Sequence, residues 1–342
     1  MAKRESGQKK NKIAAGSGGV WVFAEQYRGC LRPLALQLLA PARHLAESLQ
    51  VQVTAVLLGQ NISHLPQELI AGGADEVLQL DAEWLQLLDE GNYTHAFCHL
   101  AELYKPQIIL LGATSFGRSL APRIATKLQT GLTADCTALD IDAASGLLRQ
   151  TRPTFGGNLF ATIICPQKKP QMATVRAGVF QPLPPDQMAT GRIISLSIEP
   201  PPKGQVRHLS ILPQHEDGNI AEAKIVVAVG KGSGNADNIA LARELAQLLG
   251  GALASSRPLV DAGIMPYRCQ VGQTGRTVSP RLYIACGISG AVQHQAGMSG
   301  AKTIVAINND RQAPIFEIAD YGIVGDCAEV LRELLAQIKK MS

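Results

Sequence analysis

The residues with the clearest chemical potential form a glycine-rich turn in the second half of the chain. Residues 225–229 are all apolar, Gly230-Lys231-Gly232-Ser233-Gly234 follows them, and residues 236–249 then repeat apolar side chains at helical spacing. A turn of this kind between a strand and a helix can cradle a phosphate with backbone N–H groups, and Lys231 adds a positive charge. The spacing is neither G-x-G-x-x-G nor a Walker sequence, so a plain strand–helix turn explains it at least as well.

Further apolar runs in this half of the chain also end in small or polar residues. Residues 282–285 lead into Cys286-Gly287-Ile288-Ser289-Gly290-Ala291-Val292-Gln293-His294, the next run ends at Asn308, and a third ends near Asp326. If these runs are parallel strands, their carboxyl ends meet at one edge of a sheet. That edge is where open α/β sheets bind nucleotides, so we expect one ligand crevice there.

The segment between these strands carries hydrogen-bond donors but no catalytic constellation. It contains Ser256-Arg257 and Val271-Gly272-Gln273-Thr274, with no serine–histidine–carboxylate spacing and no general base beside a nucleophile. The seven cysteines are scattered and never form C-x-x-C, which predicts reduced thiols and no metal site. We therefore predict no catalytic residue, and a site that holds and tunes a redox cofactor whose chemistry is its own.

The elements that must position these residues predict an α/β protein of two domains, each with a mostly parallel sheet flanked by helices. Short, continuously apolar runs alternate with helical patterns, which is typical of parallel sheets covered on both faces. A proline-rich stretch over residues 182–202 marks a boundary. We expect three parts: a flexible basic tail (1–19), an N-terminal α/β domain (20–205) and a doubly wound C-terminal domain (206–342).

The element boundaries follow from the same patterns. The predicted strands of the first domain are 20–24, 51–58, 76–80 and 108–111, with helices over 34–50 and 118–128 and shorter strands within 151–179. The predicted strands of the second domain are 225–229, 282–285, 303–307 and 322–324, with helices over 236–249 and 328–339.

Charge and composition exclude several classes of partner. The formal charge is +4, but residues 1–12 hold five basic residues and one acidic residue, so the rest of the chain is balanced. Aromatic residues make up only 4% of the chain, and no apolar run reaches 18 residues. These features predict neither a nucleic-acid-binding surface nor a membrane span, and together with the reduced thiols they favour a cytoplasmic protein.

Linked motifs make the assignment more specific. Three of them lie in the second half of the chain: Arg257-Pro258-Leu259-Val260-Asp261-Ala262-Gly263, Gln270-Val271-Gly272-Gln273-Thr274-Gly275, and the stretch from Leu282 to His294. Residues 304–308, 313–316 and 319–326 continue the pattern, and Gly117-Arg118-Ser119-Leu120-Ala121-Pro122-Arg123 and Thr151-Arg152-Pro153 extend it upstream. In this order the motifs closely resemble the electron-transfer flavoprotein alpha subunit, over nearly the whole chain after residue 19.

The resemblance implies an FAD-binding C-terminal domain and roles for individual residues. It places Arg257 near the flavin ring, Thr274 at flavin N5 and His294 beside the pyrimidine oxygen. A guanidinium near the ring would favour the negatively charged reduced flavin. The remaining residues implied to contact FAD are Gln273, Ser289 and Gln293 along the ribityl chain and ring edge, Ser256, Asn308 and Asp326 toward the pyrophosphate and adenosine, and Lys231, Val271, Gly272, Gly290, Ala291, Val292 and Cys327.

Two positions depart from the family pattern. Lys231 stands where an arginine is common, which keeps the charge but loses the planar fork that grips phosphate. Cys327 stands where leucine or a similar residue is common, and a backbone contact would survive that change.

The resemblance also implies partners. The family works as a heterodimer with a beta subunit, and the chain would carry electrons between the beta-subunit flavin or NADH, or a dehydrogenase, and an acyl-CoA dehydrogenase-type flavoenzyme. The upstream motifs resemble those of anaerobic bacterial members, which favours electron bifurcation with NADH and ferredoxin as partners through the complex. The N-terminal domain would pack on the beta subunit.

Two other classes stay open from the sequence. One is a stand-alone enzyme that binds NAD(P) or another nucleotide at the Gly230–Gly234 turn. The other is a non-redox assembly subunit that kept the fold and lost the cofactor. Retention of Arg257, Thr274 and His294 together argues against the second class.

Overall fold

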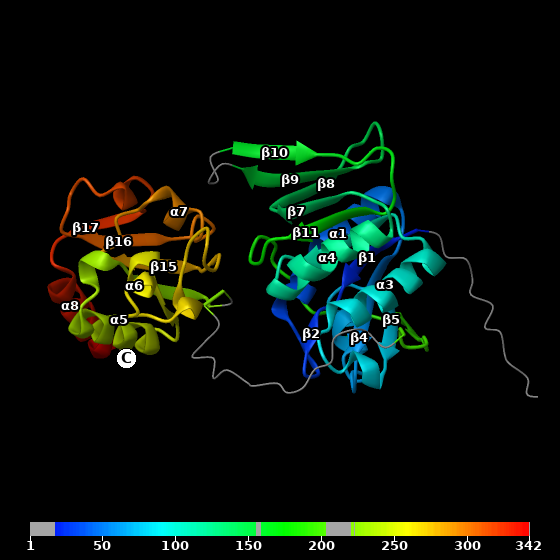
Figure 1. Cartoon of the computed structure of the whole chain (residues 1–342), viewed down its shortest axis with the longest axis horizontal. Helices are drawn as coiled ribbons and strands as arrows, with labels where there is room; N and C mark the ends of the chain where they lie inside the picture. Colours follow the sequence, from blue (N-terminus) through cyan, green and yellow to red (C-terminus); the bar gives the residue numbers. More distant parts are fainter. Residues whose placement is uncertain (1–17, 155–158, 203–219, 222, 342) are drawn as a thin grey trace, which may run out of the picture.

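A computed structural model describes residues 18–154, 159–202, 220–221 and 223–341 of the chain (Figure 1). Most of the predicted basic tail and the predicted domain boundary at residues 205–206 lie outside these ranges. No helix in the described part of the chain combines the length and the apolar composition that crossing a bilayer requires.

The first sheet has seven strands, and every pairing in it is parallel. Its central strands are buried on both faces, which explains why they are continuously apolar. The order across the sheet is β12 (Arg192–Ser195), β5 (Glu76–Asp81), β4 (Val53–Gly59), β1 (Val20–Phe23), β6 (Ile108–Gly112), β11 (Gln171–Val175) and β7 (Leu132–Cys136).

Two helices cover each face of this sheet. Helices α1 (Pro33–Leu49) and α2 (Pro66–Ala71) bury their apolar stripes on one face. Helices α3 (Glu90–Tyr104) and α4 (Ser115–Lys127) bury theirs on the other face. The sequence did not predict α3, because glycine, asparagine, threonine and histidine in it are weak helix formers. Tertiary packing of Tyr93 and Phe97 forms it nonetheless.

Two small antiparallel sheets complete this part of the chain. One has the order β10 (Leu159–Ile163), β9 (Leu148–Thr154) and β8 (Ala138–Ile141), within and next to the region where shorter strands were expected. The other pairs β2 (Gln26–Tyr27) with β3 (Cys30–Leu31).

The second sheet has five parallel strands in the order β14 (Ala252–Ser255), β13 (Ile225–Val229), β15 (Leu282–Cys286), β16 (Ile304–Asn308) and β17 (Tyr321–Val324). Chain order therefore reverses between β13 and β15, as in a doubly wound sheet. The sequence missed β14, a four-residue strand of alternating alanines that carries little periodic signal.

The two faces of the second sheet are covered differently. Helices α5 (Ala236–Leu248) and α8 (Cys327–Met341) pack together on one face. The other face is covered mainly by Val271 and Val278 in loops and by Ile315 in the 3₁₀ helix Pro314–Glu317, close to the short helix α7 (Val292–Gln295). These loops follow the carboxyl ends of the strands, so the second sheet presents its predicted site residues there.

Candidate cofactor-binding site

The parallel arrangement of the second sheet gathers the predicted site residues at one edge. Lys231, Ser256, Ser289, Asn308 and Asp326 each lie at or directly after the carboxyl end of a different strand. The sheet therefore brings together residues that lie up to 95 positions apart in the sequence.

The turn after β13 packs tightly against the turn after β15. The Gly230 N–H donates to the Cys286 carbonyl (2.8 Å), and the Gly232 N–H donates to the Gly287 carbonyl (3.2 Å). A Cβ atom on Gly230 would overlap the Gly287 backbone, so glycine is required by this close approach. Lys231 is exposed in this turn. Its charge is therefore available to an anion at the switch point of the sheet.

The loop before α7 offers backbone donors to a ligand. Among the described residues, no acceptor forms a hydrogen bond with the backbone N–H of Ser289, Gly290 or Ala291. Two hydrogen bonds to carbonyl groups hold this loop in place: Gln295 Nε2 donates to the Gly290 carbonyl (2.7 Å), and the Ile315 N–H donates to the Ser289 carbonyl (3.1 Å). Successive free N–H groups on a braced loop fit a pyrophosphate.

The Ser289 side chain does not cap the helix that follows it. Helix α7 begins at Val292 with Ala291 at its N-cap position, and no side chain caps it. The Ser289 residue is exposed, and its hydroxyl makes no hydrogen bond to the residues that the structure describes.

The segment that includes Val271, Gly272, Gln273 and Thr274 lies against α7. The Val271 N–H donates to the Ser255 carbonyl (2.9 Å), and the Gln273 N–H donates to the Gln293 carbonyl (2.7 Å). Gly272 has a φ of +142°, and a Cβ atom there would come within 2.9 Å of the Gln293 carbonyl oxygen. The loop thus joins the end of β14 to α7 and leaves Gln273 and Thr274 exposed.

Arg257 has a partner within its own helix. It begins the short helix α6 (Arg257–Asp261), directly after the buried Ser256, and its Nε donates to Asp261 Oδ2 at 3.2 Å. The Arg257 side chain is 63% exposed, and an exposed i,i+4 ion pair contributes little stability. A stronger anionic partner could therefore recruit the guanidinium at small cost.

His294 is a buried ionisable group of the site. Its Nε2 lies 2.9 Å from the hydroxyl of the fully buried Tyr283, and its Nδ1 is buried without a hydrogen-bond partner in the described part of the chain. Burial lowers the pKa of His294 to about 4, and an interaction with the Val271 backbone opposes this only in part. The ring is therefore neutral at pH 7.

Three predicted residues brace the edge with their side chains. Asn308 Nδ2 donates to the Ile288 carbonyl (3.0 Å), and Asp326 Oδ1 accepts from the Ala328 N–H (2.8 Å) at the start of α8. Cys327 Sγ lies 3.6 Å from the Ile307 carbonyl oxygen. Each of these side chains already has a partner in the fold. A ligand at Asn308, Asp326 or Cys327 would therefore bind the side chain in addition to that partner, or bind the backbone.

The structure also brings residues to the site that the sequence analysis did not single out. Gln270 and Tyr267 contact Thr274, and Tyr283 contacts His294. Gln270 is the first residue of the Gln270–Gly275 motif, but the partner of its side chain depends on the path of the loop. No periodic or compositional signal would have revealed it.

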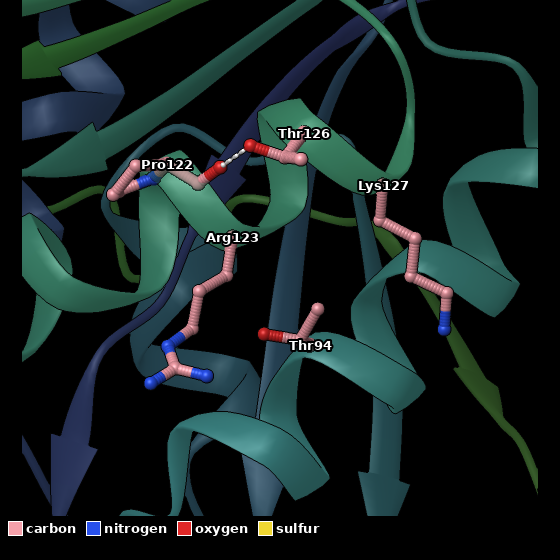
Figure 2. Close-up of a pocket in the computed structure, with 5 residues that line it drawn as sticks. All are labelled: Thr94, Pro122, Arg123, Thr126 and Lys127. Atoms are coloured by element: carbon pink, nitrogen blue, oxygen red, sulfur yellow. Dashed lines mark hydrogen bonds between the residues drawn. The ribbon is translucent and has the colours of Figure 1, made fainter.

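A pocket of about 450 Å³ lies in the first domain between α3 and α4, away from this edge (Figure 2). Figure 2 shows Arg123 and Lys127 extending from α4, with Thr94 of α3 between them in this view. Thr126 Oγ1 donates to the Pro122 carbonyl (2.8 Å). None of the predicted cofactor-binding residues lines this pocket, so it does not compete with the edge of the second sheet as the candidate site.

Comparison with known proteins finds two family matches along the chain. The model of the electron transfer flavoprotein domain matches residues 20–201, and that of the electron transfer flavoprotein FAD-binding domain matches residues 219–299. The second match includes the glycine-rich turn, the Gln270–Thr274 loop and α7.

Whole-length relatives agree with these matches. The electron transfer flavoprotein subunit alpha of Thermoanaerobacterium thermosaccharolyticum is 50% identical over 324 residues, which is 94% of this chain and 98% of the relative. Protein FixB of Clostridium saccharobutylicum is 49% identical, over 94% of this chain and 97% of the relative. The acryloyl-CoA reductase electron transfer subunit beta of Anaerotignum propionicum is 39% identical, over 94% of this chain and 95% of the relative. The chain thus belongs to the electron transfer flavoprotein alpha subunit family, whose cofactor is FAD.

Proposed function

We propose that the chain holds FAD at the carboxyl edge of its second sheet and carries electrons between a beta subunit and a partner flavoenzyme. The observation that supports this most directly is the convergence of the predicted FAD residues on one edge, beside a loop with free backbone N–H groups. Bound FAD supplies the one- and two-electron chemistry. The described residues need only bind it, orient it and set its charge preference.

Each part of the edge suits one part of the cofactor. The N–H groups of Ser289–Ala291 would hold the pyrophosphate, and the ammonium of Lys231 would add electrostatic attraction without bidentate geometry. The exposed residues Gln273 and Thr274 and the neutral His294 would face the ring system as hydrogen-bond partners. The buried Ser256 would serve the pyrophosphate and adenosine side, with Asn308 and Asp326 contributing from their braced positions.

The family and the names of relatives support the proposed partners. A protein called subunit alpha implies a second subunit, and we assign residues 20–205 to packing on it and residues 206–342 to FAD. One relative is named as an electron transfer subunit of an acryloyl-CoA reductase, which favours an acyl-CoA dehydrogenase-type partner for this chain. These names favour an electron carrier over a stand-alone NAD(P)-dependent enzyme or a non-redox assembly subunit.

An electron-transfer assay tests the proposal. The chain is co-produced with its beta subunit, and the bound flavin is reduced and mixed with an oxidised acyl-CoA dehydrogenase-type flavoenzyme. We expect reoxidation of the carrier flavin with matching reduction of the acceptor. A carrier flavin that every such acceptor leaves reduced would refute the carrier function.

Electron bifurcation makes a separate prediction within this proposal. A bifurcating complex has a second FAD in the beta subunit, so two flavins per heterodimer and NADH-dependent reduction of ferredoxin are expected. One flavin per heterodimer would exclude bifurcation and leave the simple carrier function intact.

Arg257→Ala should lower the reduction potential of the bound flavin. The guanidinium would stabilise the negative charge that the flavin gains, and a hydrogen bond to a charged group contributes about 1.5–3 kcal/mol. Because Arg257 is exposed, we expect the lower end of this range, roughly 60 mV for a one-electron step. Spectroelectrochemical titration measures it.

Asp261→Asn is the matched control for this variant. It frees the guanidinium from its helical partner, so the potential should stay unchanged or rise. An unchanged reduction potential in Arg257→Ala would show that Arg257 does not influence the potential of the bound flavin.

A further inference from the structure

We infer that Gln270 and Tyr267 are positioning residues that fix the Thr274 hydroxyl as a hydrogen-bond donor toward the isoalloxazine of FAD. The inference rests on the proposed function, because it assumes that FAD lies against the Gln273–Thr274 loop. It assigns roles to two residues that contribute through Thr274 and not through direct contact with the cofactor.

The hydroxyl and the backbone carbonyl of Thr274 each accept a hydrogen bond from a neighbouring side chain. Gln270 Nε2 donates to Thr274 Oγ1 at 3.0 Å, and the Tyr267 hydroxyl donates to the Thr274 carbonyl at 2.7 Å. Gln270 is only 3% exposed, whereas Thr274 and Tyr267 are exposed. One buried and one exposed side chain therefore restrain a residue that otherwise faces solvent.

The backbone of Gln270 is itself fixed. The Gln270 N–H donates to the Tyr267 carbonyl (3.0 Å), its carbonyl accepts from the Arg276 N–H (2.7 Å), and it forms a bridge with Ser255 at the end of β14. A Cβ atom on Gly275 would overlap the Gln270 carbonyl and come within 2.9 Å of Gln270 Cγ, so this close approach to Gln270 requires glycine. The side-chain amide of Gln270 is therefore attached to a part of the backbone that is fixed by hydrogen bonds.

The direction of this hydrogen bond has a chemical consequence. An amide NH₂ group only donates, so the Thr274 oxygen accepts from Gln270 and its own proton remains available to another acceptor. An oxidised flavin ring nitrogen is such an acceptor, and its electron density rises when the ring takes up an electron. A fixed donor aimed at that atom stabilises the reduced state more than the oxidised state and raises the potential.

Without Gln270, the Thr274 hydroxyl could rotate freely. It could then accept a hydrogen bond as readily as donate one, and its preference for the electron-rich ring would fall. The same reasoning applies more weakly to Tyr267, because loss of its hydroxyl loosens the loop without freeing the Thr274 side chain directly.

A double-mutant cycle on the reduction potential tests this mechanism in the co-produced heterodimer. Gln270→Met keeps the length of the side chain but removes the donor, and Thr274→Val removes the hydroxyl at nearly constant volume. We expect Gln270→Met to reduce the equilibrium constant for uptake of the first electron about tenfold, which is about 59 mV for a one-electron step. In the Thr274→Val background, Gln270→Met should cause no further shift.

Each alternative result has a clear meaning. An equal shift in both backgrounds, or no shift in the wild-type background, would overturn the inference, since Gln270 would then act without Thr274. If Gln270→Met does not fold, Tyr267→Phe replaces it in the same cycle, with a smaller shift that must also vanish in Thr274→Val. If the wild-type heterodimer binds no flavin, the proposed function fails and the inference falls with it. Flavin bound with unchanged potentials would refute the inference alone.

Discussion

Replacing Gly290 by alanine is expected to destabilise the second domain by about 3 kcal/mol or more and to abolish flavin retention. Gly290 has a φ of +88°, which costs any other residue roughly 1–2 kcal/mol. A Cβ atom there would also overlap the backbone of Ile315 and Pro314. Backbone atoms cannot move aside as easily as the end of a flexible side chain, so the overlap adds to the cost. The loop would have to move, together with the free N–H groups of its neighbours.

Urea unfolding and the flavin content of the purified heterodimer measure the two effects. Gly263→Ala is the matched control, because Gly263 also has a positive φ (+71°) in the same domain but has nothing within 4 Å of the added Cβ atom. We expect Gly263→Ala to cost roughly 1–2 kcal/mol and to keep its flavin. A flavin content for Gly290→Ala equal to that of the control would show that this loop does not hold the cofactor.

Acidification should destabilise the second domain through His294. Its pKa is about 4 in the folded chain, against an ordinary value of 6.5, because burial disfavours the imidazolium. Between these two values the unfolded chain binds the extra proton, so the free energy of unfolding falls as the pH drops from 6.5 to 4. The full loss is roughly 3 kcal/mol, and it is absent above pH 6.5.

Urea unfolding at pH 7 and pH 4.5, in the wild type and in His294→Gln, measures this contribution. Glutamine can still bond to the Tyr283 hydroxyl but does not titrate in this range. The variant should therefore lose less stability than the wild type on acidification. The same loss in both proteins would mean that His294 is not buried as a neutral ring.

The sequence predicted the fold best where hydrophobic periodicity is strong. The strand at residues 225–229 matches β13, and the helix predicted over 236–249 is α5, which ends one residue earlier. Helix α3 and strand β14 were missed because tertiary packing overrides weak local preference in both.

The shared edge of the predicted site residues could be predicted, but the neutral state of His294 could not. Parallel strands that end in small or polar residues imply a shared edge, and the structure shows it. The four-residue spacing of Arg257 and Asp261 also allows their pairing, and the structure shows this ion pair. The neutral state of His294 depends on burial, which the spacing of residues does not reveal. The contact of Gln270 with Thr274 depends on a tight, non-helical loop that sequence spacing does not encode.

The most direct test of the account is the absorption spectrum and flavin content of the purified heterodimer, with Gly290→Ala alongside. We predict flavin absorption bands, at least one FAD per heterodimer, and the loss of one FAD in the variant. A colourless wild-type heterodimer that does not take up added FAD would contradict the central claim that the carboxyl edge of the second sheet holds the cofactor.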